Sequence, residues 1–211
     1  MMEENKYLSL LFEKYQTKDK VASELINLEA ILNLPKATEL YISDIHAEYK
    51  AFNHIIRTCA GNIREKIDEI FPDEADQDMD QLAMLIAYPT DMLARKPLSL
   101  DEANRWSAKT IHRLLKLLRH IGAKYSRSKV RKAIDEDFRY FTEELLLSVD
   151  ADQVEKNDYY QQIIQRLIEL DLDEKLIRSL CITIQQLTVD HLHVVGDVFD
   201  RGAGADKVMD R

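Results

Sequence analysis

The sequence predicts an α/β fold in which a long, mostly helical segment lies between two short strands. Only five glycines and four prolines occur in 211 residues, and apolar side chains recur every three or four positions over most of the chain, as in helices. Two short apolar runs, residues 39–43 and 191–195, indicate strands instead, and each leads into an aspartate-containing motif. About 145 residues separate these strands, whereas a βαβ unit needs only about 30. We therefore expect a helical insertion that folds back against the sheet.

Residues 1–35 are predicted to form an N-terminal helical segment. Apolar residues at helical spacing run from Leu8 to Leu32, and Pro35 disfavours a helical conformation at the residue before it. Residues 36–61 then supply the first strand, predicted to be buried, and a helix over 51–60 that ends before Gly61. Residues 189–211 supply the second strand and the loop that follows it.

Residues 62–188 form the predicted insertion. Ser99 and Glu102 match a capping box, in which the serine hydroxyl accepts a hydrogen bond from a helical amide and the glutamate reaches back. This box opens a long helix that continues to Ile121. The apolar spacing predicts further helices at 62–71, 78–87, 137–148, 154–170 and 174–188.

The formal net charge of −9 arises from 29 basic and 38 acidic residues, but the basic residues are unevenly distributed. Residues 113–132 contain eight lysines and arginines and no acid, which leaves the rest of the chain at −17. Because the rest of the chain is so acidic, it repels a polyanion, and we therefore expect no nucleic-acid partner. A compact anionic ligand is compatible with this distribution.

The sequence predicts a cytoplasmic protein with no membrane partner. Its first six residues are too charged for a signal peptide. The longest uncharged stretch, residues 179–189, is far shorter than the roughly 18 residues that span a bilayer. Cys59 and Cys181 lack the CxxC spacing of a zinc site and lie in apolar helical patterns, which predicts buried, reduced thiols.

Both predicted strands lead into groups that bind metals. Asp44 and His46 follow the first strand two positions apart, so a hard oxygen ligand and an imidazole can face the same way. Asp197 follows the second strand, and the carboxyl ends of parallel strands meet at one edge of a sheet. Mixed aspartate and histidine donors suit divalent manganese, iron or zinc. The alternative for Asp44 is a loop aspartate that caps the helix beginning near Tyr49.

The motif GDxxDRG at residues 196–202 strengthens the metal interpretation. Its glycines allow a tight turn behind the strand, and Arg201 offers a planar guanidinium fork to phosphate oxygens. A pair of metal ions about 3.5–4 Å apart activates water for in-line attack on phosphorus. The two motifs together predict a two-metal phosphoesterase site.

The motifs DxH and GDxxDR resemble the first two sequence blocks of the calcineurin-like metallophosphoesterases. The chain is closer still to the bacterial class III fructose-1,6-bisphosphatases, which it resembles over its whole length, insertion included. The resemblance implies the N-terminal part of a calcineurin-like fold, with Asp44, His46 and Asp197 as metal ligands and with Asp200 and Arg201 as catalytic residues. The stretches that carry it are residues 34–46 (LPKATELYISDIH), 61–67 (GNIREKI), 124–133 (KYSRSKVRKA) and 189–202 (VDHLHVVGDVFDRG).

The activity that this resemblance implies is hydrolysis of fructose 1,6-bisphosphate to fructose 6-phosphate and phosphate in gluconeogenesis. The implied cofactor is a divalent metal, manganese in first place, and Arg201 is expected to stabilise the equatorial phosphoryl oxygens. Two alternatives remain. A broader metallophosphoesterase for phosphoproteins or dinucleotides would share both motifs but not the long insertion, and a non-catalytic helical module would act by association with another subunit.

The chain departs from the family pattern at two loops and at its end. Ala47 stands where the family keeps a glycine, which strains the loop if the backbone there needs a positive φ. Ala203 and Ala205 replace prolines of the family and loosen the turn behind Arg201. The sequence ends before the blocks that complete the family's metal shell. We therefore expect an N-terminal portion that is inactive without the C-terminal part, holds at most one weakly bound ion and exposes a sheet edge that favours self-association.

The basic segment offers candidate ligands for a second phosphate of the sugar bisphosphate or for a phosphorylated effector. These candidates are Arg127, Lys129, Arg131 and Lys132. The alternative is a solvated helix face followed by a basic turn. Structural or surface positions are predicted for His54, Trp106, His112, His120, His191 and His193.

Overall fold

The computed structural model describes residues 2–94, 99–149 and 154–211, and the chain divides into two compact units, residues 1–36 and 37–211. The first unit contains α1 (Met2–Lys14) and α2 (Lys18–Leu32). The break between them lies at Thr17, whose hydroxyl accepts a hydrogen bond from the Lys20 amide at 3.3 Å and caps α2. The apolar spacing before Pro35 is thus confirmed as helical.

The apolar side chains of this first unit are largely exposed. No residue of α2 is buried, and Phe12 and Leu32 are 70% and 84% exposed. Within this unit the periodicity therefore predicts the helices, and the two helices do not bury these side chains against each other.

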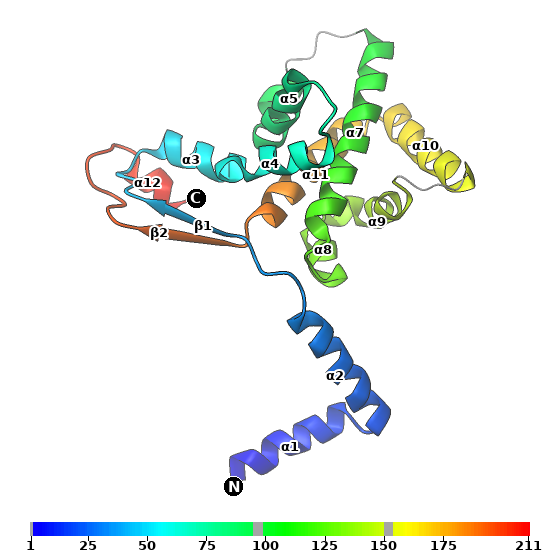
Figure 1. The fold of residues 1–211 in the computed structure, drawn as a ribbon, viewed down its shortest axis with the longest axis vertical. Helices are drawn as coiled ribbons and strands as arrows, with labels where there is room; N and C mark the ends of the chain where they lie inside the picture. The colour runs from blue at the N-terminus through cyan, green and yellow to red at the C-terminus, as the bar shows by residue number, and fades with distance from the viewer. Residues whose placement is uncertain (1, 95–98, 150–153) are drawn as a thin grey trace. The chain divides into compact units, whose positions relative to one another are not determined.

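The second unit contains a two-stranded parallel sheet with a long series of helices between its strands (Figure 1). The strands β1 (Glu39–Ser43) and β2 (His191–Val195) have the predicted bounds. The helices between them are α3 (Tyr49–Thr58), η1 (Cys59–Gly61), α4 (Asn62–Ile70), α5 (Asp76–Ala87), α6 (Pro89–Leu93), α7 (Leu100–Gly122), α8 (Arg127–Ala133), η2 (Glu136–Phe138), α9 (Arg139–Ser148), α10 (Val154–Glu169) and α11 (Asp173–Thr188). After β2 comes α12 (Ala205–Met209).

The predicted long helices are confirmed to within a few residues at their ends, whereas the short helices α6, α8 and α12 are absent from the sequence prediction. In the basic segment a turn that contains Lys124 follows α7, as the alternative interpretation has it, but residues 127–133 then form α8, which the sequence does not predict. Its start is stabilised by Ser126, whose hydroxyl accepts a hydrogen bond from the Lys129 amide at 3.3 Å. A polar N-cap outweighs the weak apolar periodicity of this segment.

We call α4 to α11 the helical cluster, and α7 and α11 lie at its centre. The predicted capping box is present, with the Ser99 amide donating to the Glu102 carboxylate at 3.1 Å. Leu114 and Leu118 of α7 and Leu176 of α11 are fully shielded from solvent. The apolar faces of the insertion are therefore satisfied mainly by one another.

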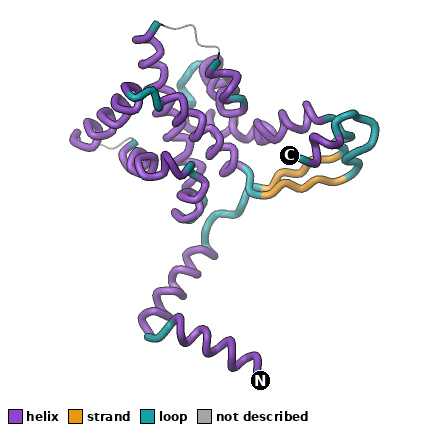
Figure 2. Tube along the Cα trace, turned by 180° about the vertical axis from the view of Figure 1, so that it is seen from behind, coloured by secondary structure: helices purple, strands orange, loops and turns teal. Residues whose placement is uncertain are grey.

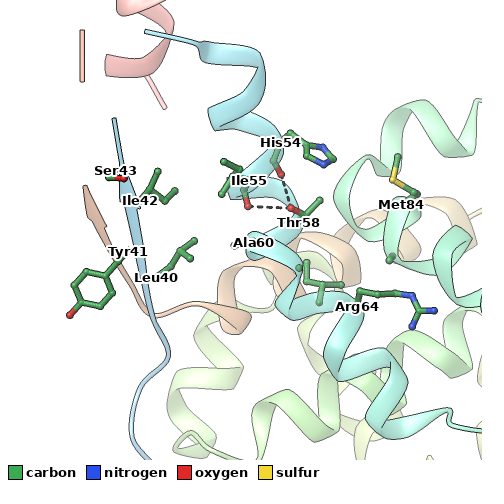
Figure 3. Close-up of a pocket in the computed structure, with 13 residues that line it drawn as sticks. Leu40, Tyr41, Ile42, Ser43, His54, Ile55, Thr58, Ala60, Arg64 and Met84 are labelled. Carbon is green, nitrogen blue, oxygen red and sulfur yellow. Dashed lines mark hydrogen bonds between the residues drawn. The ribbon is translucent and has the colours of Figure 1, made fainter. Parts of the chain in front are cut away.

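The expectation that the insertion folds back against the sheet is wrong. Figure 2 shows the strands extending away from the helical cluster, with α3 beside them and α12 near their far end. No residue of β1 or β2 is buried, which also contradicts the prediction of a buried first strand. A cavity of about 670 Å³ separates β1 from α3, η1 and α4, and Leu40 and Ile42 face it (Figure 3). The helices of the insertion leave the sheet uncovered because their apolar faces are already paired. Ile42 of β1 packs instead against a small core formed by Ile45, Phe52 of α3 and Val208 of α12.

Both cysteines are free and buried, as predicted. Burial raises the pKa of the Cys59 thiol to about 11 and raises that of Cys181 as well. These thiols are structural rather than reactive. Among the described residues, none of the helices has the length and apolar character needed to span a bilayer.

Candidate functional site

The parallel pairing of β1 and β2 brings the two motif-bearing loops together. Ser43 lies opposite Val195, so residues 44–48 and 196–204, which we call the site loops, start at the same edge of the sheet. Backbone hydrogen bonds continue beyond the strands: the His46 amide donates to the Asp197 carbonyl at 3.0 Å, and the Gly202 amide donates to the His46 carbonyl at 2.8 Å. The loops are therefore tied to each other through their backbones.

The site loops contain an unusual number of residues with a left-handed backbone. The φ angles of Asp44, His46, Ala47 and Arg201 are 52°, 50°, 57° and 72°. Such conformations cost energy in residues with a Cβ and gather where function requires a fixed geometry. Because φ is positive at Ala47, the methyl group of this residue strains the loop, as the sequence predicts for that case.

Two glycines let the loops approach closely. A Cβ on Gly202 would collide with the His46 carbonyl and lie 2.7 Å from the backbone of Ala47. A Cβ on Gly196, which has a φ of 78°, would collide with the Asp44 carboxylate. The GDxxDRG glycines therefore allow the close contact of the two loops, in addition to the tight turn for which the sequence assigns them.

Three side chains from the two loops converge on one point. His46, Asp197 and Asp200 each offer a ligand atom, and these atoms lie within 4.8 Å of one another. His46 is half-buried and both aspartates are exposed. One imidazole and two carboxylates at this spacing suit a divalent cation.

Hydrogen bonding orients this group. His46 Nδ1 lies 2.6 Å from Asp200 Oδ1, and the bond to His46 lowers the pKa of the Asp200 carboxyl below its usual value. An ionised Asp200 accepts the proton of Nδ1, which leaves the lone pair of His46 at Nε2. Arg201 adds its Nε at 3.2 Å from Asp200 Oδ2, while its side chain is 75% exposed. The guanidinium is thus held near the donors and open to solvent.

The ligand group differs from the predicted ligand set in one member. Asp44 is not one of the three converging residues; its Oδ1 accepts a hydrogen bond from the Asp197 amide at 3.3 Å. Asp200, which the sequence assigns to catalysis, takes a place in the group instead. The roles of Asp44 and Asp200 as ligand or catalytic residue stay predictions.

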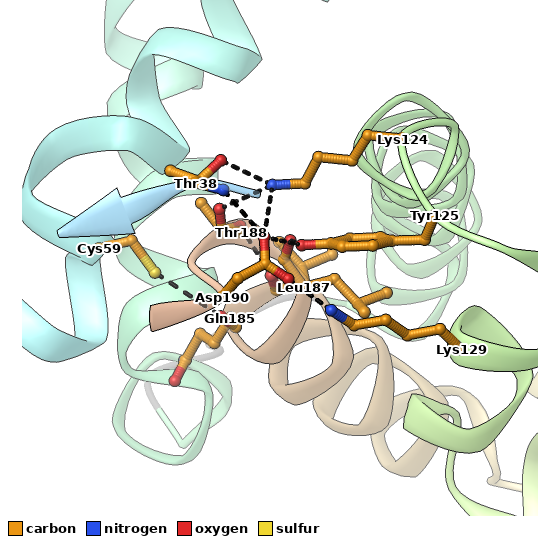
Figure 4. A network of polar contacts seen from close by, with 10 residues as sticks. Thr38, Cys59, Lys124, Tyr125, Lys129, Gln185, Leu187, Thr188 and Asp190 are labelled. Carbon is orange, nitrogen blue, oxygen red and sulfur yellow. Dashed lines mark hydrogen bonds and ion pairs between the residues drawn. The ribbon is translucent and has the colours of Figure 1, made fainter. Parts of the chain in front are cut away.

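The basic segment makes contacts at the opposite end of the strands. Asp190, which immediately precedes β2, accepts hydrogen bonds from Tyr125 Oη at 2.7 Å and from the Thr38 amide at 2.9 Å (Figure 4). Lys124 Nζ lies 3.3 Å from the same carboxylate, and Lys129 Nζ forms an ion pair with it. The Asp190 side chain is only 4% exposed. This network joins α8 and the turn before it, residues 123–126, to the start of both strands.

Charge and burial act against each other at Asp190. Burial alone would raise the pKa of its carboxyl, but the hydrogen bonds from Lys129, Tyr125 and the Thr38 amide hold that pKa well below its usual value. Burial and the bond to Asp190 raise the pKa of Tyr125. Asp190 is therefore an ionised, buried anchor.

The four candidate phosphate ligands of the basic segment do not act as one cluster. Lys129 is paired with Asp190, and Arg131 Nε lies 3.7 Å from Glu143 Oε1. Arg127 and Arg131 line a cavity of about 210 Å³ that Glu143 also lines. Lys132 is exposed on α8. A phosphate role for these residues stays a prediction, with Lys129 already engaged by an acid.

The remaining candidates contact protein groups. His193 stacks on Tyr41 at a centroid distance of 4.4 Å. Trp106 packs against the core of the helical cluster. The other histidine contacts are His54 with Tyr88, His112 with Tyr160, His120 with Glu69 and His191 with His193.

Asp190 and Tyr125 are the structural residues that sequence reasoning missed. They are separated by 65 residues, so no local spacing rule relates them. The available signal was weak: an acid directly before a strand and an acid-free basic segment elsewhere in the same chain.

The sequence matches the family described as Firmicute fructose-1,6-bisphosphatase over residues 6–211. It is 47% identical to the class 3 fructose-1,6-bisphosphatase of Bacillus velezensis over 211 residues, 98% of this chain and 33% of that protein. The proteins of the same name from Ligilactobacillus salivarius and Oceanobacillus iheyensis are 48% and 46% identical over 96% and 99% of this chain, and 32% and 33% of their own lengths. The chain thus spans about a third of these curated relatives. No solved structure matches it.

Proposed function

The chain belongs to the family of Firmicute fructose-1,6-bisphosphatases, as its motifs predict, and we propose that it supplies part of a site that hydrolyses fructose 1,6-bisphosphate to fructose 6-phosphate and phosphate. The observation that carries this proposal is the convergence of His46, Asp197 and Asp200 beside Arg201 at the carboxyl edge of two parallel strands. Metal donors next to a guanidinium suit a phosphoryl substrate. The reaction is a step of gluconeogenesis.

We further propose that β1 and β2 are the first two strands of a calcineurin-like sheet. Their parallel pairing, their exposed faces and the motifs at their carboxyl ends support this proposal. Two strands alone make a marginal sheet, and further strands would pair with the open edges of β1 and β2. The corresponding strands would come from the two thirds of the relatives' length that lie outside the match.

The residues present fit a divalent ion, and manganese suits their mixed donor set. His46 and Asp197 would hold it, with Asp200 or Asp44 as the next donor. When bound, such an ion polarises a phosphoryl oxygen and lowers the pKa of water. A pair of ions needs more ligands than these, which in this proposal the segment beyond the match provides.

The chain's own residues position the reaction. The ionised Asp200 fixes the ring of His46 and its tautomer through the Nδ1 hydrogen bond. Arg201, exposed and anchored through Nε, presents its terminal nitrogens to phosphate oxygens, where a planar fork donates two parallel hydrogen bonds. The backbone bonds between the site loops hold both groups in register.

The test is a chimera in which residues 1–211 replace the matched segment of the Bacillus velezensis relative. Phosphate release from fructose 1,6-bisphosphate is measured with manganese. We expect Asp197→Ala to lose both activity and bound metal. Arg201→Lys should lower kcat while metal content is kept, since an ammonium cannot form the bidentate contact. Arg166→Lys, on the exposed face of α10, is the matched control and should change neither.

Three outcomes would contradict the proposal. Equal rates on a dinucleotide and on the sugar bisphosphate would favour a broad phosphoesterase. A folded chimera that binds manganese and releases no phosphate would favour the non-catalytic helical module. Unchanged activity in Arg201→Lys would remove the guanidinium from the mechanism.

A further inference from the structure

A second cluster of positive charge lies away from the site loops. A cavity of about 450 Å³ is lined by residues of α3, α6 and α11 and by Arg211, just beyond α12. Three of its lining residues are arginines: Arg57, Arg178 and Arg211. Arg57 and Arg178 are half-buried. None of the residues assigned to metal or phosphoryl binding lines this cavity.

The described contacts of these arginines are with neutral groups. Arg57 Nη1 donates to the Ala87 carbonyl at 3.2 Å, Arg57 Nε donates to Asn53 Oδ1 at 3.4 Å, and the guanidinium lies 5.2 Å from the centre of the Tyr88 ring. Arg178 donates from one Nη to the Thr90 hydroxyl. Arg211 donates from Nε to Asn53 at 3.1 Å. Each guanidinium therefore keeps donors that these bonds do not use.

No acidic side chain is among the residues that line the cavity, and the ion pairs of the described residues do not include Arg57 or Arg178. Other arginines of the chain form ion pairs with acids: Arg64 pairs with Asp80 at 2.8 Å, and Arg166 pairs with Glu169 at 3.1 Å. In a chain with a net charge of −9, acids are abundant. Arg57 and Arg178 therefore face one cavity whose lining contains no acidic side chain, and their positive field is one that an anionic ligand would neutralise.

The rest of the lining indicates an organic anion rather than a bare ion. Ile56, Pro89 and Ile182 supply an apolar wall beside the guanidinium groups, and Gln186 adds an amide. The volume of about 450 Å³ falls within the range of small-molecule sites, which is about 300–1,000 Å³. A ligand with a charged group and a short carbon skeleton would contact both the guanidinium groups and the apolar wall.

We propose that this cavity binds a small organic phosphate, with the phosphomonoester dianion against Arg57 and Arg178 and the carbon skeleton against Ile56 and Ile182. Planar guanidinium groups donate paired hydrogen bonds to phosphate oxygens, and several of them complement a dianion better than a monoanion. The site is separate from the site loops. A phosphate bound there would contact both α3 and α11, which lie on different sides of the cavity.

The test uses the 211-residue chain in EDTA, so that no metal-dependent binding at the site loops contributes. Glycerol phosphate is titrated by calorimetry, with malonate as a dicarboxylate of similar size. We expect saturable one-to-one binding of glycerol phosphate and at least about tenfold weaker binding of malonate. Arg178→Gln and Arg57→Gln should each raise the Kd for glycerol phosphate at least about tenfold, the effect of losing charge-assisted hydrogen bonds.

Two controls locate the bound anion. Arg166→Gln, at an exposed position on α10, and Arg201→Gln, in the site loops, should leave the Kd unchanged. Circular dichroism checks that each variant is folded; if Arg57→Gln loses structure with its bond to Ala87, Arg178→Gln and Arg178→Lys decide the question. Binding lost in Arg201→Gln but kept in Arg178→Gln would overturn the proposal, as would absence of saturable binding or equal affinity for malonate.

Discussion

The helical cluster and the strand end of the same unit differ in nearly every physical respect. In the cluster, Leu114, Leu117 and Leu118 are completely shielded, and apolar packing holds the helices together. In the strands no residue is buried, and the site loops are held by backbone hydrogen bonds, by glycines that permit close approach and by a small core of Ile45, Phe52 and Val208. The largest apolar core thus lies in the insertion, while the groups that carry chemistry lie outside the insertion, in the site loops.

Asp190 connects these two regions. Its carboxylate receives donors from the helical cluster through Lys124, Tyr125 and Lys129, and from the first strand through the Thr38 amide. The strands therefore start from a fixed point on the cluster. Substitutions in the core of the helical cluster, at Asp190 and in the site loops should, in that order, produce progressively smaller losses of stability or binding.

The largest effect is expected in the core. Leu118→Ala should lower the free energy of unfolding by about 3–5 kcal/mol, because it removes buried methyl groups and leaves a cavity at the centre of α7. Leu192→Ala, on a strand residue that is 41% exposed, should cost less than about 1 kcal/mol. Urea unfolding followed by circular dichroism measures both. Similar losses in the two variants would contradict the contrast drawn between the regions.

The junction should show the next largest effect. Asp190→Ala leaves two ammonium groups without their carboxylate and should cost about 3 kcal/mol, at the low end for a buried pair because Lys129 is half exposed. Asp73→Ala, at an exposed acid, is the control and should change stability by less than about 0.5 kcal/mol.

The same variant predicts a pH dependence. Because the pKa of Asp190 is lowered by folding, its contribution to stability is full above the ordinary value of 3.8 and is lost as pH falls below it. The unmodified chain should therefore lose stability on acidification more steeply than Asp190→Ala. Equal slopes in unfolding experiments between pH 5 and 2 would show that Asp190 is not the anchor.

Metal binding by the chain as it stands is expected to be weak and confined to one ion. Asp197→Asn should weaken manganese binding at least about tenfold, as measured by the signal of free manganese in electron paramagnetic resonance. Asp44→Asn should have a smaller effect, because Asp44 lies outside the converging group. The reverse order would restore Asp44 as a metal ligand, in agreement with the resemblance, and would make it a stronger ligand than Asp197.

The smallest effect concerns the strained loop. Ala47→Gly should stabilise the site loops by about 0.5 kcal/mol, the balance between relief of a left-handed alanine and the greater flexibility of glycine. Hydrogen exchange of the Gly202 amide, which bonds to the adjacent His46 carbonyl, reports this change. Ala203→Gly, where φ is not positive, is the control and should speed exchange slightly or leave it unchanged.

The sequence by itself determined the features that depend on neighbouring residues. The apolar spacing predicts the long helices, the Ser99 and Glu102 pair predicts the start of α7, and short apolar runs predict both strands. The motifs after those strands predict where metal donors occur and identify the family, since their glycines and acids lie within a few positions of one another.

The tertiary structure alone decided which of these features meet. The partner of His46 is Asp200, 154 residues away, and Lys129 pairs with Asp190, 61 residues away. The insertion leaves the sheet uncovered because α7 and α11 bury their apolar faces against each other. Apolar spacing along the chain does not predict which two faces pack together. Apolar spacing predicts a helix with one apolar face but does not identify the partner of that face, because packing and ion pairing depend on distances in space rather than along the chain.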